Sequence, residues 1–194
     1  MSRFVPDPDA LRLGEALREA DCILSLGARL GDSLTGGYEL MNPREQGRRI
    51  IHVYPDPDEI GHLWRADPGI AACPRTVLAA LAGTEAPRRW DDWTASVRAH
   101  YETWQTPKPT PGAVRMEQVV CWLSANLPED AILTNGAGNY ASFVHRYFRF
   151  KRARTQIAPT SGSMGYGLPA AVAARIHHPD RTVVCVAGDG DIQM

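Results

Sequence analysis

The stretch Thr182-Val183-Val184-Cys185-Val186-Ala187-Gly188-Asp189-Gly190 decides the fold. Its first part, residues 182–187, is an uncharged and largely apolar run, typical of a strand that is buried on both faces of a parallel sheet. We therefore expect a central parallel strand here. The acidic turn Gly188-Asp189-Gly190 follows the carboxyl end of that strand, which is the end at which open α/β sheets bind ligands.

The residues before this strand alternate between helical and strand patterns. Residues 116–127 and 168–177 have the apolar spacing of helices, whereas residues 131–134 form a short apolar run that predicts a strand. A glycine-containing turn at residues 136–140 leads into another helix, which we expect to extend through Phe148. Strands that alternate with helices favour a parallel sheet.

The first half of the chain shows the same alternation. Residues 21–27 and 48–54 predict buried strands, and helices are expected over residues 9–20 and 76–81. Asp56, which is followed by proline and further acids, is typical of the residue that caps the start of a helix.

Residues 87–112 interrupt the alternation. Aromatic residues recur there at helical spacing up to Trp104, and a proline-rich segment follows at residues 107–112. The sequence therefore predicts an α/β fold with two partial, doubly wound parallel-sheet domains of Rossmann-like type. They cover residues 1–86 and 113–194, and the helical, proline-rich segment links them.

The composition fits a soluble globular protein. Of the 194 residues, 44% are hydrophobic and 22% charged, and the net charge is -1. Such a balance gives no electrostatic reason to expect nucleic acid or a membrane surface as a partner. No apolar run is long enough to span a bilayer, and the N-terminus lacks a signal-peptide pattern, so we expect a cytoplasmic protein. The four cysteines lack metal-ligand spacing, and we expect buried, reduced thiols.

Three glycine-bearing turns are candidates for a ligand site, although a tight turn without a ligand explains each of them alone. Residues 136–141 match the loose GxGxxA form of a dinucleotide fingerprint. That motif requires an acidic residue about twenty positions later, and residues 131–179 contain none. Residues 162–167 hold three glycines, which let a backbone approach a ligand closely. Asp189 in the third turn can bind Mg²⁺, which takes one or two carboxylates together with phosphate oxygens.

The same half of the chain is basic. Residues 131–179 contain six Lys and Arg residues and no acid, in a chain of net charge -1. Solvated basic faces account for most such side chains, but an anionic ligand would also find this half favourable.

The ordered pair of later motifs resembles the cofactor-binding domain of thiamine diphosphate-dependent enzymes of the acetolactate synthase kind. Residues 160–171, Thr-Ser-Gly-Ser-Met-Gly-Tyr-Gly-Leu-Pro-Ala-Ala, carry the likeness together with Gly188-Asp189-Gly190. Residues 1–86 resemble the second half of the family's central domain. Relatives often have Asp at the position of Tyr54, so the binding of FAD, which some members contact, stays open.

The resemblance implies a role for each turn. Asp189 would bind Mg²⁺, which bridges to the diphosphate, and Met164 would prop the cofactor into a bent shape with its flexible thioether. No catalytic side chain is assigned in this chain. The residues expected to bind the cofactor are Gly136, Asn139, Tyr140, Gly162, Ser163, Met164, Gly188, Gly190 and Asp191.

The implied reaction is decarboxylation of a 2-keto acid or related small substrate, with ligation of the remaining carbons to a second molecule. The family's activating Glu lies in an N-terminal domain, and its second metal side chain, an Asn, lies about a helix beyond Gly190. Neither is in this chain, so we expect a truncated chain that is inactive alone, and a homodimer or homotetramer for the full-length protein. The alternatives are a non-catalytic nucleotide- or anion-binding Rossmann-like module and a gene remnant without a stable fold.

Overall fold

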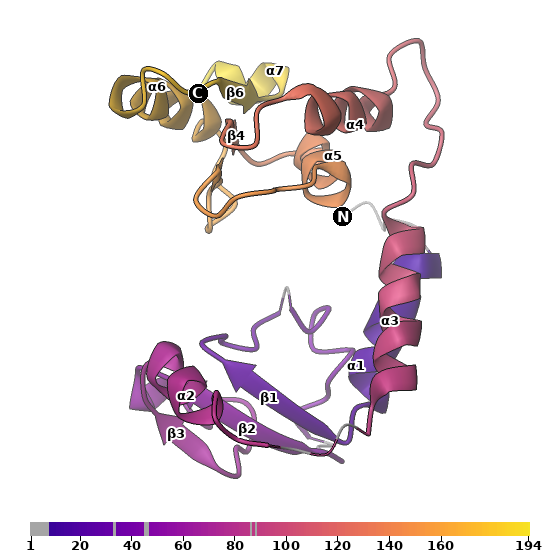
Figure 1. Cartoon of the computed structure of the whole chain (residues 1–194), viewed down its shortest axis with the longest axis vertical. Coiled ribbons are helices and arrows are strands. Elements are labelled where there is room, and N and C mark those ends of the chain that lie inside the picture. Colours follow the sequence, from indigo (N-terminus) through magenta and orange to yellow (C-terminus); the bar gives the residue numbers. More distant parts are fainter. Residues whose placement is uncertain (1–7, 33, 45–46, 86, 88) are drawn as a thin grey trace. The chain divides into compact units, whose positions relative to one another are not determined.

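The chain divides into two compact units, each with its own parallel sheet (Figure 1). The computed structural model describes residues 8–32, 34–44, 47–85, 87 and 89–194. The first unit ends at Trp104, and the second extends from Gln105 to Met194. Both contain a three-stranded parallel sheet with helices, which confirms the predicted α/β fold class.

The sheet of the first unit is ordered β1-β2-β3. Its strands are β1 (Cys22–Leu26), β2 (Arg49–Tyr54) and β3 (Gly69–Ala71), and both neighbouring pairs are parallel. Ile50 and Val53 of the central strand β2 are completely buried. The sequence predicted β1 and β2 but not β3, which is too short to show a pattern.

One helix precedes the strands of this sheet in the sequence, and two helices follow them. They are α1 (Pro8–Glu19), α2 (Pro74–Leu81) and α3 (Asp91–Trp104), with the short 3₁₀ turn η1 (Pro57–Glu59) between β2 and β3. As predicted, Asp56 caps η1: its Oδ1 accepts a hydrogen bond of 3.0 Å from the Asp58 backbone N–H. Helix α3 packs against α1 within the first unit, although the predicted linker includes it.

Strand β4 is the central strand of the second unit, which is ordered β5-β4-β6. The strands are β4 (Ile132–Asn135), β5 (Gln156–Ile157) and β6 (Val183–Val186), again in parallel pairs. All four residues of β4 are buried, whereas those of β6 are only half-buried. The expectation of a central strand buried on both faces is therefore wrong for β6 in this sheet, because an apolar run does not show where a strand lies in the order.

Two of the helices of the second unit share a core with β4. Helix α4 packs against α5, and the core cluster contains Val120, Leu133, Val144 and Tyr147. Helix α6 packs against β4 and β6. The helices are α4 (Met116–Asn126), α5 (Asn139–Tyr147), α6 (Gly167–His177) and the short α7 (Asp189–Ile192).

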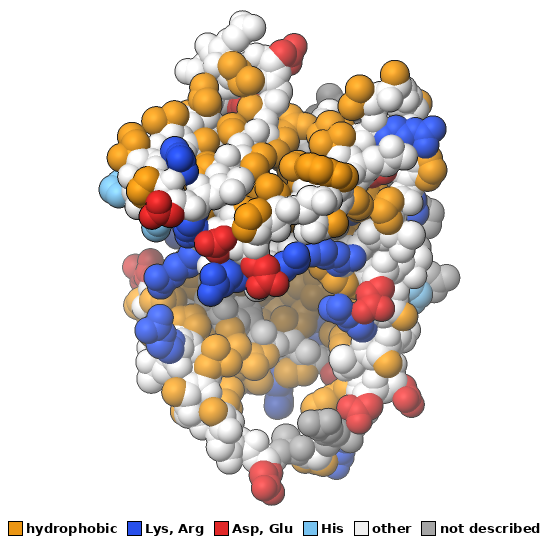
Figure 2. Space-filling view, turned by 45° about the horizontal axis from the view of Figure 1, so that its top comes forward, with side chains coloured by type: hydrophobic (Ala, Val, Ile, Leu, Met, Phe, Trp, Pro, Cys, Tyr) orange, Lys and Arg blue, Asp and Glu red, His pale blue; other side chains and the backbone are white. Residues whose placement is uncertain are grey.

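The described surface also carries apolar side chains (Figure 2). A groove of about 550 Å³ lies between α6 and α7 and is lined by Leu168, Val172 and Ile176 among others. None of the described helices combines the length and the apolar character that a membrane span requires.

The cysteines are all free. Cys121 and Cys185 are half-buried, but Cys22 and Cys73 are exposed. The expectation of buried thiols is therefore wrong for the latter two, and Cys22 is accessible because it begins the edge strand β1.

Candidate functional site

Three glycine-bearing turns meet at the carboxyl edge of the sheet in the second unit. Strands β4 and β6 are parallel and in register, with Asn135 opposite Val186, so both strands end at the same edge. The first turn, residues 136–141, follows β4 and enters α5, and the third, residues 188–190, follows β6. The second turn, residues 162–167, leads into α6, which packs against both strands. This edge is where open α/β sheets bind ligands.

The first and second turns are in backbone contact. The buried Thr134 hydroxyl, at the end of β4, donates a hydrogen bond of 2.8 Å to the Gly167 carbonyl. A Cβ on Gly167 would lie only 2.7 Å from the Gly136 nitrogen and 2.8 Å from the Asn135 carbonyl carbon. Backbone atoms cannot give way as a flexible side chain can, so α6 begins this close to β4 only because residue 167 is glycine.

Asp191 joins the third turn to the other two. Its side chain is buried, and the residue is 3% exposed. The Gly165 N–H, in the second turn, donates a hydrogen bond of 2.6 Å to Oδ1. The hydroxyl of Tyr140, at the start of α5, donates to Oδ2. Burial of the carboxylate is tolerated here because both of its oxygens have donors.

The phenol of Tyr140 is held in its neutral form. Burial, followed by the hydrogen bond to Asp191 and the negative charge of that carboxylate, raises the pKa of Tyr140 to about 12. The hydroxyl therefore keeps its proton at neutral pH and donates a hydrogen bond to Asp191.

Two other predicted site residues, Asp189 and Met164, are exposed. Asp189 is exposed, and its Oδ1 accepts a hydrogen bond of 2.9 Å from the Gly190 N–H. Met164 is 45% exposed, and its Cε lies 3.4 Å from where a Cβ on Gly190 would be. Met164 of the second turn thus faces Gly190 of the third turn.

Three further predicted residues are exposed and less closely tied to the cluster. Gly162 has a φ of 70° and no heavy atom within 4 Å of its Cβ position among the described residues. Ser163 shares a hydrogen bond of 2.7 Å with the Ser161 hydroxyl. Asn139 begins α5, and its carbonyl accepts a hydrogen bond of 2.6 Å from the Ser142 hydroxyl.

The arrangement fits a magnesium-bound diphosphate. The described residues contain no group of three or more His, Cys, Asp or Glu that could hold a metal. A Mg²⁺ ion that is shared with phosphate oxygens needs only one or two carboxylates, and the exposed Asp189 offers one. Gly188 and Gly190 flank that carboxylate and leave the backbone accessible.

A buried polar atom also lies beside this edge. Asn135 ends β4 and is 1% exposed; its Nδ2 donates a hydrogen bond of 2.8 Å to the Gly136 carbonyl. Its Oδ1 has no hydrogen-bond partner within the part of the chain that the structure describes. Thr134 and Asn135 were not among the site residues predicted from the sequence, although two polar residues at the end of an otherwise apolar strand are a signal for them.

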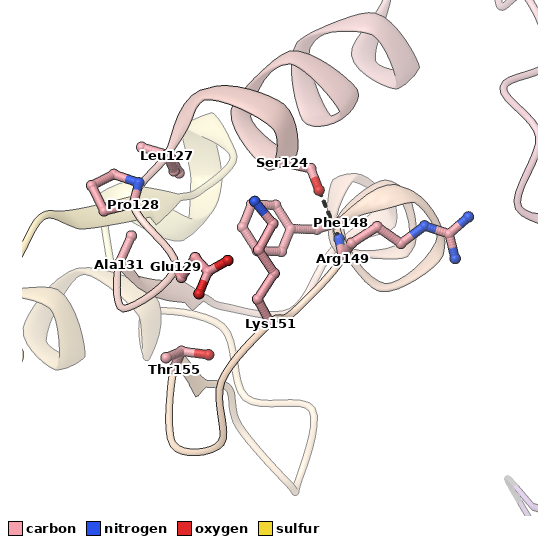
Figure 3. Close-up of a pocket in the computed structure, with 9 residues that line it drawn as sticks. All are labelled: Ser124, Leu127, Pro128, Glu129, Ala131, Phe148, Arg149, Lys151 and Thr155. Atoms are coloured by element: carbon pink, nitrogen blue, oxygen red, sulfur yellow. Dashed lines mark hydrogen bonds between the residues drawn. The ribbon is translucent and has the colours of Figure 1, made fainter.

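Three of the basic residues that favour an anionic ligand in the sequence, Arg149, Lys151 and Arg175, have their contacts away from this edge. Arg149 and Lys151 line a small pocket with Ala131 and Thr155, at the amino ends of β4 and β5 (Figure 3). Its volume of about 10 Å³ is at the lower limit of what a single water molecule needs. Arg175 donates to the Arg181 carbonyl at 3.0 Å. Arg149, Lys151 and Arg175 thus have contacts away from this edge, which favours the simpler of the two interpretations for these three cations.

Both units match known families. Residues 136–194 match the family described as thiamine pyrophosphate enzyme, C-terminal TPP binding domain, which includes all three turns. Residues 10–81 match the family described as thiamine pyrophosphate enzyme, central domain. The chain belongs to the thiamine pyrophosphate enzymes. Thiamine pyrophosphate and thiamine diphosphate are the same cofactor, so the predicted family is confirmed.

Curated relatives of this thiamine pyrophosphate enzyme include several acetolactate synthase large subunits. The chain is 32% identical over 184 residues to that of Parasynechococcus marenigrum and 31% identical over 189 residues to that of Corynebacterium glutamicum. It is 29% identical over 180 residues to the isozyme 2 large subunit of Escherichia coli. Each match covers 92% of this chain but only 29%, 29% and 32% of the respective relative. The chain thus spans about a third of the length of the curated relatives it matches.

Proposed function

We propose that this chain is the part of a thiamine diphosphate- and Mg²⁺-dependent enzyme that holds the diphosphate and its metal. The enzyme would be a 2-keto acid decarboxylase or carboligase of the acetolactate synthase kind. The meeting of the three turns at the carboxyl edge of β4 and β6 carries the proposal. When bound, the cofactor supplies an electron sink for cleavage of the bond beside the keto group.

The residues of this chain would bind and orient the cofactor. Asp189 has an exposed carboxylate that would bind Mg²⁺. Gly190 leaves room beside it, and the Met164 thioether, which faces Gly190, would support the cofactor from the second turn. The backbone amides before α5, from Gly136 to Asn139, offer donors to diphosphate oxygens.

Calorimetric titration of the 194-residue chain with thiamine diphosphate, with and without Mg²⁺, tests this proposal. We expect Mg²⁺-dependent binding, and we expect Asp189→Asn to weaken it at least about tenfold, since even residues outside the metal's ligand set change affinity by that much. Asp180→Asn is the matched control, because Asp180 is also exposed but lies in the turn before β6, at the amino edge.

The same titration with ADP and with inorganic pyrophosphate separates the proposal from the alternative. A non-catalytic nucleotide- or anion-binding module would bind ADP at least as tightly as thiamine diphosphate. It would also be insensitive to Asp189→Asn. Either result would contradict the proposed function.

We further propose that the 194-residue chain by itself does not turn over a 2-keto acid, because it spans only about a third of its relatives' length. Release of CO₂ from a 2-keto acid by the purified chain with cofactor would overturn this. FAD binding stays open. At the position where relatives often have Asp, the Tyr54 hydroxyl instead accepts a hydrogen bond of 3.2 Å from Arg29. The homo-oligomer and the cytoplasmic setting stay predictions.

A further inference from the structure

The contacts of Asp191 are not those of a residue that faces a diphosphate. Its two carboxylate oxygens are occupied by the Tyr140 hydroxyl and the Gly165 N–H, and 3% of the residue is exposed. Asp189, two positions earlier in the same short helix, is exposed. Residues two apart on a helix point to different sides. Asp189 and Asp191 therefore have different roles.

We propose that Tyr140 and Asp191 form a clasp that holds the three turns in the arrangement that binds the diphosphate. This inference rests on the proposed function. Within it, Asp191 is a positioning residue, and the Mg²⁺-binding role belongs to Asp189 alone. Through one buried carboxylate, the clasp connects three elements: α5, the second turn and α7.

Charge supports this assignment. A carboxylate that faced the diphosphate without a metal between them would repel it, and that repulsion is strong where water is excluded. Turning the Asp191 carboxylate onto a phenol and an amide removes the conflict, because both groups are donors. A buried carboxylate that loses one of its donors is costly, which makes the geometry of the clasp well defined.

Two glycines that are predicted to approach the cofactor also make room for the clasp. A Cβ on Gly136 would collide with the Asp191 carboxylate. A Cβ on Gly188 would lie 3.3 Å from Cε1 of the Tyr140 ring. Both positions are therefore restricted by the two clasp residues even before a ligand is considered.

Two substitutions separate the clasp from a simple effect of charge. Tyr140→Phe removes the hydroxyl without changing the charge of the site. Asp191→Asn removes the charge but keeps the shape, with an oxygen that can accept from Gly165 and an amide that can donate to the Tyr140 hydroxyl. If the clasp positions the turns, Tyr140→Phe weakens cofactor binding more than Asp191→Asn does. If Asp191 instead acts directly through its charge, Asp191→Asn has the larger effect on binding.

The first readout needs no ligand. We expect Tyr140→Phe to speed hydrogen exchange of the Gly165 amide by about tenfold, the effect of losing a hydrogen bond to a charged group. Exchange at Leu133, in the buried centre of β4, should change no more than in Tyr147→Phe, which alters the other tyrosine of α5. Asp191→Asn should leave the protection of Gly165 close to that of the unchanged protein.

The second readout is the affinity for thiamine diphosphate with Mg²⁺, measured by calorimetry. We expect Tyr140→Phe to weaken it by about tenfold and Asp191→Asn to weaken it less. Unchanged Gly165 exchange in Tyr140→Phe would overturn the clasp, as would an equal rise at Leu133, which would indicate a general loss of stability. Tighter binding by Asp191→Asn with no effect of Tyr140→Phe would show that Asp191 acts through its charge. If the unchanged protein does not bind the cofactor, the proposed function fails, and the exchange measurement alone still decides whether the clasp exists.

Discussion

Glu117 is a buried carboxylate in the first turn of α4. Its two oxygens accept hydrogen bonds from one residue: the Thr110 N–H at 3.1 Å and the Thr110 hydroxyl at 2.6 Å. The hydroxyl hydrogen bond is the main cause that lowers the pKa of Glu117 below its ordinary value, and burial opposes it. The hydrogen bonds between Thr110 and Glu117 therefore hold the proline-rich segment against α4, the first helix of the second unit.

This pair predicts a specific dependence of stability on pH. A carboxyl group whose pKa is lower in the folded state stabilises the fold above its unfolded pKa of about 4.3, and this stabilisation is lost as the pH falls through the lower, folded value. We expect Glu117→Gln to lower the unfolding temperature at pH 7 and to make it fall less steeply below about pH 5. Thermal unfolding followed by circular dichroism from pH 7 to pH 3 measures both effects.

Glu129→Gln is the control for this experiment, since Glu129 is an exposed carboxylate in the same unit. An identical pH dependence in the unchanged protein and in Glu117→Gln would contradict the assignment. The measurement has a second use, because a chain without a stable fold would show no cooperative transition at any pH.

Asp189 and Asp191 show how far single residues can be predicted from spacing. The sequence places both in the turn after β6, and the structure exposes one and buries the other. The difference depends on Tyr140, which lies 51 positions from Asp191 along the chain and meets it only after folding. Spacing within a motif therefore locates this turn but cannot decide which way each side chain points.

At the scale of helices and strands, the long and regular elements are the predictable ones. Strand β2 and helix α6 lie within one residue of their predicted bounds. Strand β5 was missed because two residues cannot show a period, and a neighbour defines it: the Leu133 N–H donates a hydrogen bond of 2.8 Å to the Thr155 carbonyl. A strand of this kind is defined by its pairing with a neighbouring strand, and the local sequence pattern does not reveal that pairing.

The junction between β4 and α6 offers a test at this scale. The Thr134 hydroxyl is fully buried and donates to the Gly167 carbonyl, so Thr134→Val, which nearly keeps the shape, removes this hydrogen bond. We expect a loss of about 0.5–1.5 kcal/mol in the free energy of unfolding. Denaturant unfolding measures the loss, with Thr182→Val as the control because Thr182 is exposed just before β6. Equal stability of Thr134→Val and Thr182→Val would show that the junction does not depend on this bond.

At the scale of the whole molecule, the two units have separate cores. Leu30, Met41, Ile50 and Trp64 form the core of the first, and none of them belongs to the cluster around Leu133 in the second. All three turns of the candidate site and the Tyr140–Asp191 contact lie in the second unit, between Gln105 and Met194. A defect in the first core should therefore not reach the site unless the units are coupled energetically.

A pair of matched substitutions measures that coupling. Ile50 and Leu133 are buried in the central strands β2 and β4, and replacing either with alanine is expected to cost its own unit about 2–5 kcal/mol. If the cores are independent, Ile50→Ala speeds hydrogen exchange of the β2 amides but leaves those of β4, and the affinity for thiamine diphosphate, unchanged. Leu133→Ala should do the reverse and weaken binding. Faster exchange in β4 on substitution of Ile50 would instead mean that the two units unfold as one, because a destabilisation confined to one core cannot change the opening free energy of the other.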